Sequence, residues 1–185
     1  MKEPGKIIIY NLFPPLVGAL SNWEKHLVRA SEMGFNWLYA NPLQLPGKSG
    51  SLYAIADYFD FNPLFIDQKS EKKPDVQVKE MIQSAEKSGL QVMADLVINH
   101  CASDSKLLKS HPKWFAWEAK GQVVHPSADQ DGKKVTLQDL AKFDHQNTED
   151  KEGLYQFFFK VVKFLADLGF KGFRCDAAYQ IPKNW

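Results

Sequence analysis

The sequence predicts an α/β fold with a parallel sheet covered by helices on both faces, because one helix-to-strand junction occurs three times. Gly34, Gly89 and Gly169 each follow a helical pattern and precede an apolar residue and a strand-like run. A glycine just past a helix end accepts the left-handed conformation that ends the helix. Near-continuous apolar strands that alternate with helices are typical of parallel sheets buried on both faces.

Three segments carry apolar residues at helical spacing, and each stripe ends just before one of these glycines. The stripes are Leu20, Trp23, Leu27, Ala30 and Met33; then Val78, Met81, Ile82 and Ala85; then Leu154, Phe157, Phe158, Val161, Val162 and Leu165. Ser21 and Pro74 lie where an N-cap serine or an early helical proline is favoured. We interpret the stripes as core packing.

Four strands are predicted around these helices, over Lys6–Phe13, Asn36–Pro42, Gln91–Asn99 and Lys171–Ala177. The resulting order of four strands and three helices allows two folds. One is a doubly wound open sheet, and the other is half of an eight-stranded (β/α) barrel, with about four β/α units.

Two connections are long, and both follow the carboxyl end of a strand, where such folds place their sites. Residues 43–73 follow the second strand, and residues 100–151 follow the third. The second connection is too long for a simple loop, so we expect an inserted subdomain over residues 100–151, with a turn in Asp129–Lys134. Residues 1–99 and 152–185 would then form the partial barrel.

The composition excludes several functional classes. The 185 residues include 23 Lys and Arg and 22 Asp and Glu, and the net charge of +1 gives no reason to expect nucleic acid or an anionic membrane as a partner. No glycine-rich phosphate loop follows the first strand, which argues against a dinucleotide or nucleoside triphosphate enzyme. Two cysteines and a polar N-terminus without a signal-like segment indicate reduced thiols and a cytoplasmic protein.

Polar residues near the end of the fourth predicted strand are candidates for a catalytic role. Side chains alternate along a strand, so Arg174 and Asp176 would point the same way and Cys175 the opposite way. A guanidinium beside a carboxylate keeps it ionised, as a nucleophile toward a glycosidic carbon must be. A buried ion pair that only supports the sheet is the structural alternative.

The third predicted strand carries a second set of polar residues. Asp95, Val97 and Asn99 would share one face, and a buried Asp95 needs a partner, for which Arg174 is the obvious candidate. Asn99 and His100 lie at the strand end. His100 alone could be a metal ligand or a core histidine, but no second His or Cys stands at zinc-ligand spacing from it, so we assign no metal ligand and expect no zinc site.

These segments resemble signature regions of the α-amylase family (glycoside hydrolase family 13). Asp95–His100 resembles the first region, and Gly172–Ala178 resembles the second, in which the Asp is the nucleophile. Tyr53–Tyr58 resembles the segment whose tyrosine stacks under the sugar at the cleavage site. The resemblance spans nearly the whole chain and implies the first half of a TIM (β/α)8 barrel.

The resemblance implies roles for particular residues. Asp176 would be the nucleophile and Arg174 its neighbour, with Asp95 in structural support. The substrate-binding residues would be Tyr53, Asp57, Asn99 and His100. The Asn of this motif helps to hold calcium in some members, but its other ligands are not identifiable, so no cofactor is assigned and calcium stays open.

Shorter matches indicate a branch of the family. His111–Phe115, Glu152–Tyr155 and Ile181–Trp185 are similar to the maltosyltransferases that extend α-glucans from maltose 1-phosphate. Tyr179-Gln180 departs from the Lys-His pair of starch-cleaving amylases, which argues against ordinary starch hydrolysis. The expected partner is therefore an α-glucan oligosaccharide or a maltosyl donor.

In this family the proton-donating glutamate follows the fifth strand, beyond Trp185. We therefore expect a retaining α-glucan hydrolase or transglycosylase present as an N-terminal fragment, inactive alone and needing the C-terminal half of the barrel or self-association. One alternative is a non-catalytic carbohydrate-binding or interaction module derived from this fold. A weaker one is an unrelated sugar-phosphate barrel enzyme.

Overall fold

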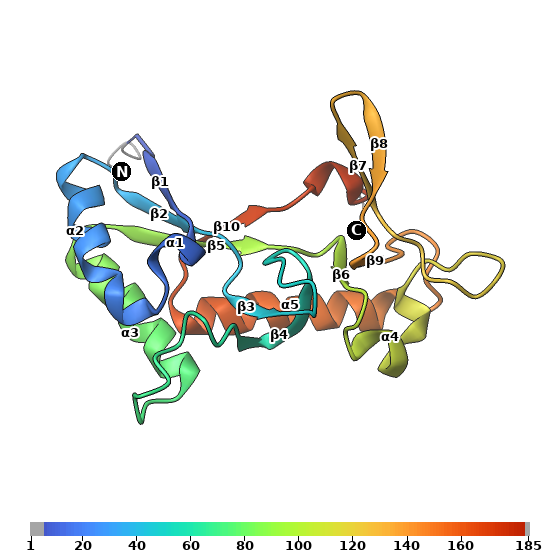
Figure 1. Ribbon diagram of the computed structural model, residues 1–185, viewed down its shortest axis with the longest axis horizontal. Helices are drawn as coiled ribbons and strands as arrows, with labels where there is room; N and C mark the ends of the chain where they lie inside the picture. Colours follow the sequence, from blue (N-terminus) through green and yellow to red (C-terminus); the bar gives the residue numbers. More distant parts are fainter. Residues whose placement is uncertain (1–5, 184–185) are drawn as a thin grey trace. The chain divides into compact units, whose positions relative to one another are not determined.

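The computed structural model describes residues 6–183, which fall into two compact units (Figure 1). Unit 1 contains the described residues up to Leu43, together with Phe61–Asp95 and Lys163–Arg174. Unit 2 contains Gln44–Asp60, Leu96–Val162 and the described residues from Cys175 onward. Unit 2 thus includes the predicted insertion 100–151 along with other segments, and the predicted domain division stays a prediction.

A four-stranded sheet, almost entirely within unit 1, has the strand order β1-β2-β5-β10. Its strands are β1 (Ile9–Leu12), β2 (Trp37–Ala40), β5 (Gln91–Leu96) and β10 (Gly172–Cys175). The first three pair in parallel, with Tyr39 opposite Asn11 and Met93. β10 is parallel to β5. A hydrogen bond joins Lys171 N to Val92 O and another joins Asp176 N to Leu96 O, so the residue numbers of the partners increase in the same direction along the two strands. The predicted parallel α/β arrangement of these four strands is confirmed.

Helices α2 (Glu24–Glu32) and α3 (Pro74–Lys87) lie side by side along the strands of unit 1 (Figure 1). Their apolar stripes are buried as predicted, except that Met33, at the C-cap of α2, is 50% exposed. The core includes the fully buried side chains of Trp23, Leu27, Leu38, Val78, Ile82 and Val92. A short helix α1 (Pro14–Val17) and a 3₁₀ helix η1 (Leu20–Asn22) precede α2. Helix α5 (Lys151–Leu168) contributes its last turns to unit 1 and the rest to unit 2.

The three glycines at the predicted junctions have the left-handed backbone expected of them, with φ of 87°, 81° and 115° at Gly34, Gly89 and Gly169. Pro74 begins α3, as predicted. The prediction for Ser21 was wrong: it lies inside η1, and Trp23 is the N-cap of α2, with no capping bond from its side chain. A 3₁₀ turn, bonded from Trp23 N to Leu20 O, occupies the place of the expected cap.

All four strands end earlier than predicted. β5 ends at Leu96 because the next carbonyls bond partners outside the sheet: Val97 O lies 3.1 Å from the Tyr58 hydroxyl, and Ile98 O lies 2.7 Å from His145 Nε2. β10 ends at Cys175, and Ala177 has a φ of 42° that no strand accommodates. Val97, Asn99 and Asp176 therefore lie beyond the strand ends, so the expectation that they belong to the strands was wrong.

Three small two-stranded sheets lie in unit 2, except that Phe61, the last residue of β4, belongs to unit 1. They are β3 (Gln44–Pro46) with β4 (Ile55–Phe61), β6 (His100–Ala102) with β9 (Leu140–Lys142), and β7 (Ser127–Gln130) with β8 (Lys133–Thr136). The β7–β8 hairpin is the gold ribbon in Figure 1. Its turn is Asp131-Gly132, with φ of 54° and 76°, inside the predicted turn segment. Helices α4 (Leu107–Ser110) and η2 (Pro112–Trp114) follow β6, and a 3₁₀ helix η3 (Ala178–Gln180) follows β10.

Among residues 6–183, no helix is both long enough and apolar enough to cross a lipid bilayer.

Candidate active site

In unit 1, the carboxylate of Asp95 is the centre of a hydrogen-bond network at the carboxyl ends of the strands. Its side chain has an exposed fraction of 0%. Arg174 Nη1 donates to both carboxylate oxygens, at 3.0 and 3.1 Å, and the Tyr39 hydroxyl donates to Oδ2. The predicted pairing of Asp95 with Arg174 is confirmed. The pair offsets the desolvation free energy of the buried carboxylate.

The network extends to residues that the sequence analysis did not single out. Asn41 Nδ2 lies 3.4 Å from the Tyr39 hydroxyl, and Asn11 Nδ2 donates to Asn41 Oδ1 at 3.0 Å. The Arg174 guanidinium carbon lies 6.0 Å from the centre of the Tyr39 ring. The missed signal was the presence of polar residues in or just after the otherwise apolar strands β1 and β2.

Asp176 belongs to unit 2 and comes directly after β10. Its side chain is half-buried, and its backbone N–H donates to Leu96 O at 3.0 Å. This bond fixes the backbone of Asp176 to the end of β5, two residues beyond Arg174 along the chain. A half-buried carboxylate on a fixed backbone is accessible to a ligand and limited in its freedom.

His100 is buried and holds one tautomer. Its Nε2 lies 3.1 Å from the Tyr53 carbonyl oxygen, so Nε2 carries the proton, while the buried Nδ1 has no hydrogen-bond partner among the described residues. Burial lowers the pKa of His100, although the Asp176 carboxylate, the bond to Tyr53 and Asp139 act in the opposite direction. A neutral imidazole thus presents a lone pair that a ligand hydroxyl can satisfy.

Asn99 also keeps an unused buried acceptor. Its Oδ1 has no hydrogen-bond partner within the described chain, and its Nδ2 lies 3.5 Å from Gln180 Oε1. Calcium takes six to eight oxygen ligands. Asn99 offers one free oxygen, and residues 6–183 contain no group of three His, Cys, Asp or Glu side chains arranged to hold a metal. The described donors therefore do not form a calcium site.

Tyr53 and Asp57 lie on the β3–β4 side of unit 2, and both are half-buried. The Tyr53 carbonyl is fixed by His100, which links the two predicted substrate-binding segments. Asp57 Oδ1 accepts a bond from Phe59 N at 2.9 Å, and the residue lines a pocket of about 170 Å³ together with Lys106 and Phe157. Their assignment to substrate binding stays a prediction.

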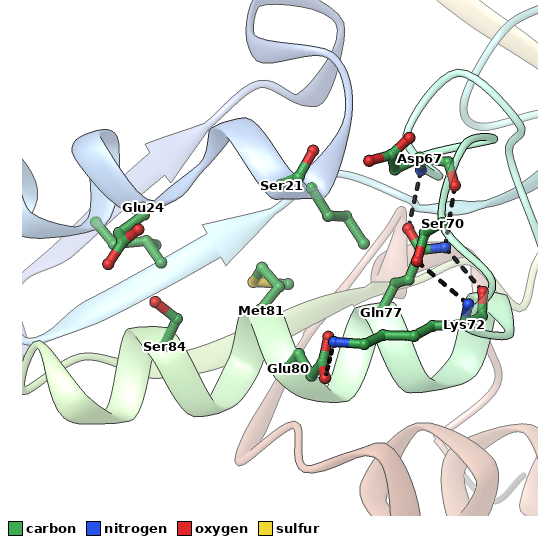
Figure 2. Close-up of a pocket in the computed structure, with 11 residues that line it drawn as sticks. Ser21, Glu24, Asp67, Ser70, Lys72, Gln77, Glu80, Met81 and Ser84 are labelled. Carbon is green, nitrogen blue, oxygen red and sulfur yellow. Dashed lines mark hydrogen bonds and ion pairs between the residues drawn. The ribbon is translucent and has the colours of Figure 1, made fainter.

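A pocket of about 320 Å³ in unit 1 lies between α2, α3 and residues 67–72 (Figure 2). Its polar groups largely bind one another. Lys72 Nζ pairs with Glu80 at 2.7 Å, and the Gln77 amide bonds to the backbone of Asp67 and Lys72. The close-up shows these bonds converging on Gln77 and Lys72, whereas no bond is drawn to Ser21, Glu24 or Ser84.

Comparisons with known proteins place these elements in a family. The model of the glycogen debranching enzyme glucanotransferase domain matches residues 4–119, more than half of the chain. The chain belongs to the α-amylase family.

Solved structures agree with this assignment. The fold of this α-amylase-family chain matches that of an α-amylase from Lactobacillus plantarum with a TM-score of 0.76 and 26% identity, covering 95% of this chain and 39% of that one. A maltogenic α-amylase from Thermotoga neapolitana matches equally, with a TM-score of 0.76, 27% identity, and coverage of 95% and 40%. The predicted family and the α/β class of the fold are therefore confirmed, whereas the half-barrel stays a prediction.

Among curated relatives, the α-1,4-glucan:maltose-1-phosphate maltosyltransferase of Mycolicibacterium smegmatis is 29% identical over 92% of this chain and 25% of its own length. The glycogen debranching enzyme of Saccharomyces cerevisiae is 32% identical over 50% of this chain and 6% of its own length. The part of each relative that this chain matches is thus about a quarter or less of the length of that relative.

Proposed function

We propose that this chain forms the first half of the catalytic (β/α)8 barrel of a retaining α-glucan hydrolase or transglycosylase, with Asp176 as the nucleophile. The observation that carries the proposal is the position of Asp176. It directly follows the strand whose Arg174 binds Asp95, and its N–H is bonded to the end of the strand that bears Asp95. The carboxyl ends of barrel strands are where enzymes of this fold place catalytic groups.

In the first proposed step, an Asp176 carboxylate oxygen attacks the anomeric carbon and forms a glycosyl ester. The glycosidic C–O bond breaks, and the leaving oxygen takes a proton from a second carboxyl group about 5 Å away. In the second step, the hydroxyl of water or of a sugar attacks the same carbon. Asp176 leaves as a carboxylate, and the hydroxyl proton returns to the second carboxyl group.

The second carboxyl group is proposed to lie outside residues 1–185, in the remaining barrel. The maltosyltransferase and the debranching enzyme compared above are about four times longer or more. β1 and β10 are the outer strands of the described sheet, and three residues in or just before β1, namely Ile7, Ile8 and Ile9, are exposed. Further strands would pair with both edges and cover this apolar surface.

The network in unit 1 is proposed to position β10 and so the backbone that leads to Asp176. Arg174 keeps a side-chain exposure of 43% while it binds Asp95, so a neighbouring anion can approach its side chain. We assign it the task of holding Asp176 ionised in the closed site. Asp95 and Tyr39 hold the guanidinium in place.

The substrate-binding residues are proposed to be Tyr53, Asp57, Asn99 and His100. The unused acceptors His100 Nδ1 and Asn99 Oδ1 support this, because a sugar hydroxyl can donate to each of them. Tyr53 would offer its ring face to the sugar. Residues 100–151, which contain several small elements, would form the insertion between a strand and its helix.

The test uses the complete open reading frame that contains this chain, with soluble starch and maltose 1-phosphate as separate donors. We expect turnover that falls by at least about 1,000-fold in Asp176→Asn. Faster turnover with maltose 1-phosphate than with starch would favour the maltosyltransferase branch. The 185-residue chain alone is expected to be inactive on both donors. Turnover that survives in Asp176→Asn would contradict the proposed nucleophile.

A further inference from the structure

Residues 112–117 and 144–149 form a second pocket in unit 2, with a volume of about 330 Å³. It contains none of the residues proposed for catalysis. Its size lies at the lower end of the range of about 300–1,000 Å³ that is typical of small-molecule sites. Unlike the hollow beside α3, it has aromatic rings among its lining residues, together with polar groups.

Trp117 supplies a fixed aromatic surface. The residue is 43% exposed, which is unusual for so large an apolar side chain. Its Nε1 donates to Pro112 O at 2.8 Å, so the only polar atom of the ring is satisfied and the orientation of the ring is set. The exposed surface is left for apolar contact with a ligand.

The two walls of the pocket are bonded to each other. Asp144 N donates to Trp114 O at 2.9 Å, and Thr148 Oγ1 donates to Lys113 O at 2.6 Å. Trp114 is itself anchored, because its Nε1 donates to Asp150 Oδ2 at 2.7 Å. The pocket is therefore preformed, which lowers the entropic cost of binding.

Polar groups line the wall that includes Asp144. Its Oδ1 accepts bonds from the backbone of Gln146 and from Asn147, whereas no bond to Oδ2 is formed within the described chain. At the rim, Lys113 Nζ and Glu149 Oε2 form an exposed ion pair at 2.9 Å. Acceptors and donors thus surround a flat apolar surface.

We propose that this pocket binds a glucose unit of an α-glucan as a second, non-catalytic site. A pyranose ring has an apolar C–H face that matches the Trp117 ring, and its equatorial hydroxyls can donate to Asp144 Oδ2 and bond the Lys113–Glu149 pair. The pocket chemistry fits a pyranose, and the choice of an α-linked sugar rests on the proposed function.

Isothermal titration of the full chain with maltotriose, and with cellotriose as the β-linked counterpart, tests the pocket. We expect maltotriose to bind with a millimolar dissociation constant, and Trp117→Ala to weaken it by about tenfold or more. Trp117→Phe should retain most of the affinity. Phe159→Ala, which removes an exposed ring from α5, should leave the affinity unchanged.

Absence of maltotriose binding at about ten times the expected constant, or unchanged affinity in a folded Trp117→Ala chain, overturns the proposal. Equal binding of cellotriose overturns the α-glucan assignment. If Trp117→Ala fails to fold, NMR spectroscopy replaces it. The indole N–H resonance of Trp117 is identified as the one missing from the spectrum of Trp117→Phe. This resonance must shift in the parent chain during titration with maltotriose. A failure here leaves the turnover result for Asp176→Asn unaffected, so the two proposals fail separately.

Discussion

Arg174 Nη1 donates to both carboxylate oxygens of Asp95, joining β10 to β5 through a carboxylate that has no solvent exposure. Truncating Arg174 leaves the buried carboxylate of Asp95 without the guanidinium that balances its charge. Breaking such a pair typically costs about 3–5 kcal/mol, and the 43% exposure of the Arg174 side chain reduces this.

We therefore predict that Arg174→Met lowers the free energy of unfolding by about 2 kcal/mol. Urea denaturation of the chain measures this. The double variant Arg174→Met/Asp95→Asn should lose less than the sum of the single losses, because the two side chains interact. Strict additivity would show that the pair contributes no coupling.

Two buried histidines predict loss of stability in mild acid. Burial lowers the pKa of both His100 and His145, so the unfolded chain binds more protons below a pH of about 6.5. Stability is therefore present above this pH and declines as the pH falls toward the folded pKa values. Denaturation at pH 7.5, 6.5 and 5.5 should give a decreasing free energy of unfolding, with a shallower slope in His100→Gln. An unchanged slope in that variant would mean that His100 does not contribute.

The two cysteines should differ in reactivity. Cys101 is buried and burial raises its pKa to about 12, whereas Cys175, at the end of β10, is exposed. We predict that an aromatic disulfide reagent modifies one thiol of the native chain rapidly and the second only after denaturation. Cys175→Ser should abolish the rapid phase, and two thiols reacting at equal rates would contradict the burial of Cys101.

The Tyr58 hydroxyl is buried within hydrogen-bonding distance of the carbonyl oxygens of Val97 and His100, at 3.1 and 2.9 Å. Tyr58→Phe leaves these acceptors without their donor, so we expect a loss of about 1–2 kcal/mol in the free energy of unfolding. Tyr155→Phe, at an exposed position on α5, serves as the matched control and should change stability by less than about 0.5 kcal/mol. Equal effects of the two substitutions would rule out a special role for this bond.

Periodicity and turn chemistry were enough to predict the four strands, the three helices and the Arg174–Asp95 pair. These features depend on local spacing and on the need of a buried charge for a partner. The strand ends were not predictable in this way, because the carbonyls that follow β5 bond side chains from distant segments, such as Tyr58. The contributions of Tyr39 and Asn11 were missed for the same reason, since each looks like an ordinary strand residue until β1 and β2 are in register. The cytoplasmic location stays a prediction.

Covalent trapping on the complete polypeptide tests Asp176 most directly. In a 5-fluoro-α-glucosyl fluoride, the anomeric fluoride leaves readily and the second fluorine slows hydrolysis of the ester, so the glycosyl-enzyme should accumulate. We predict one glucosyl adduct by intact mass, located on the peptide that contains Asp176. It should be absent from Asp176→Asn and unchanged in Asp144→Asn. An adduct on another carboxylate, or none in a preparation that turns over an α-glucan, would contradict the assignment of Asp176 as the nucleophile.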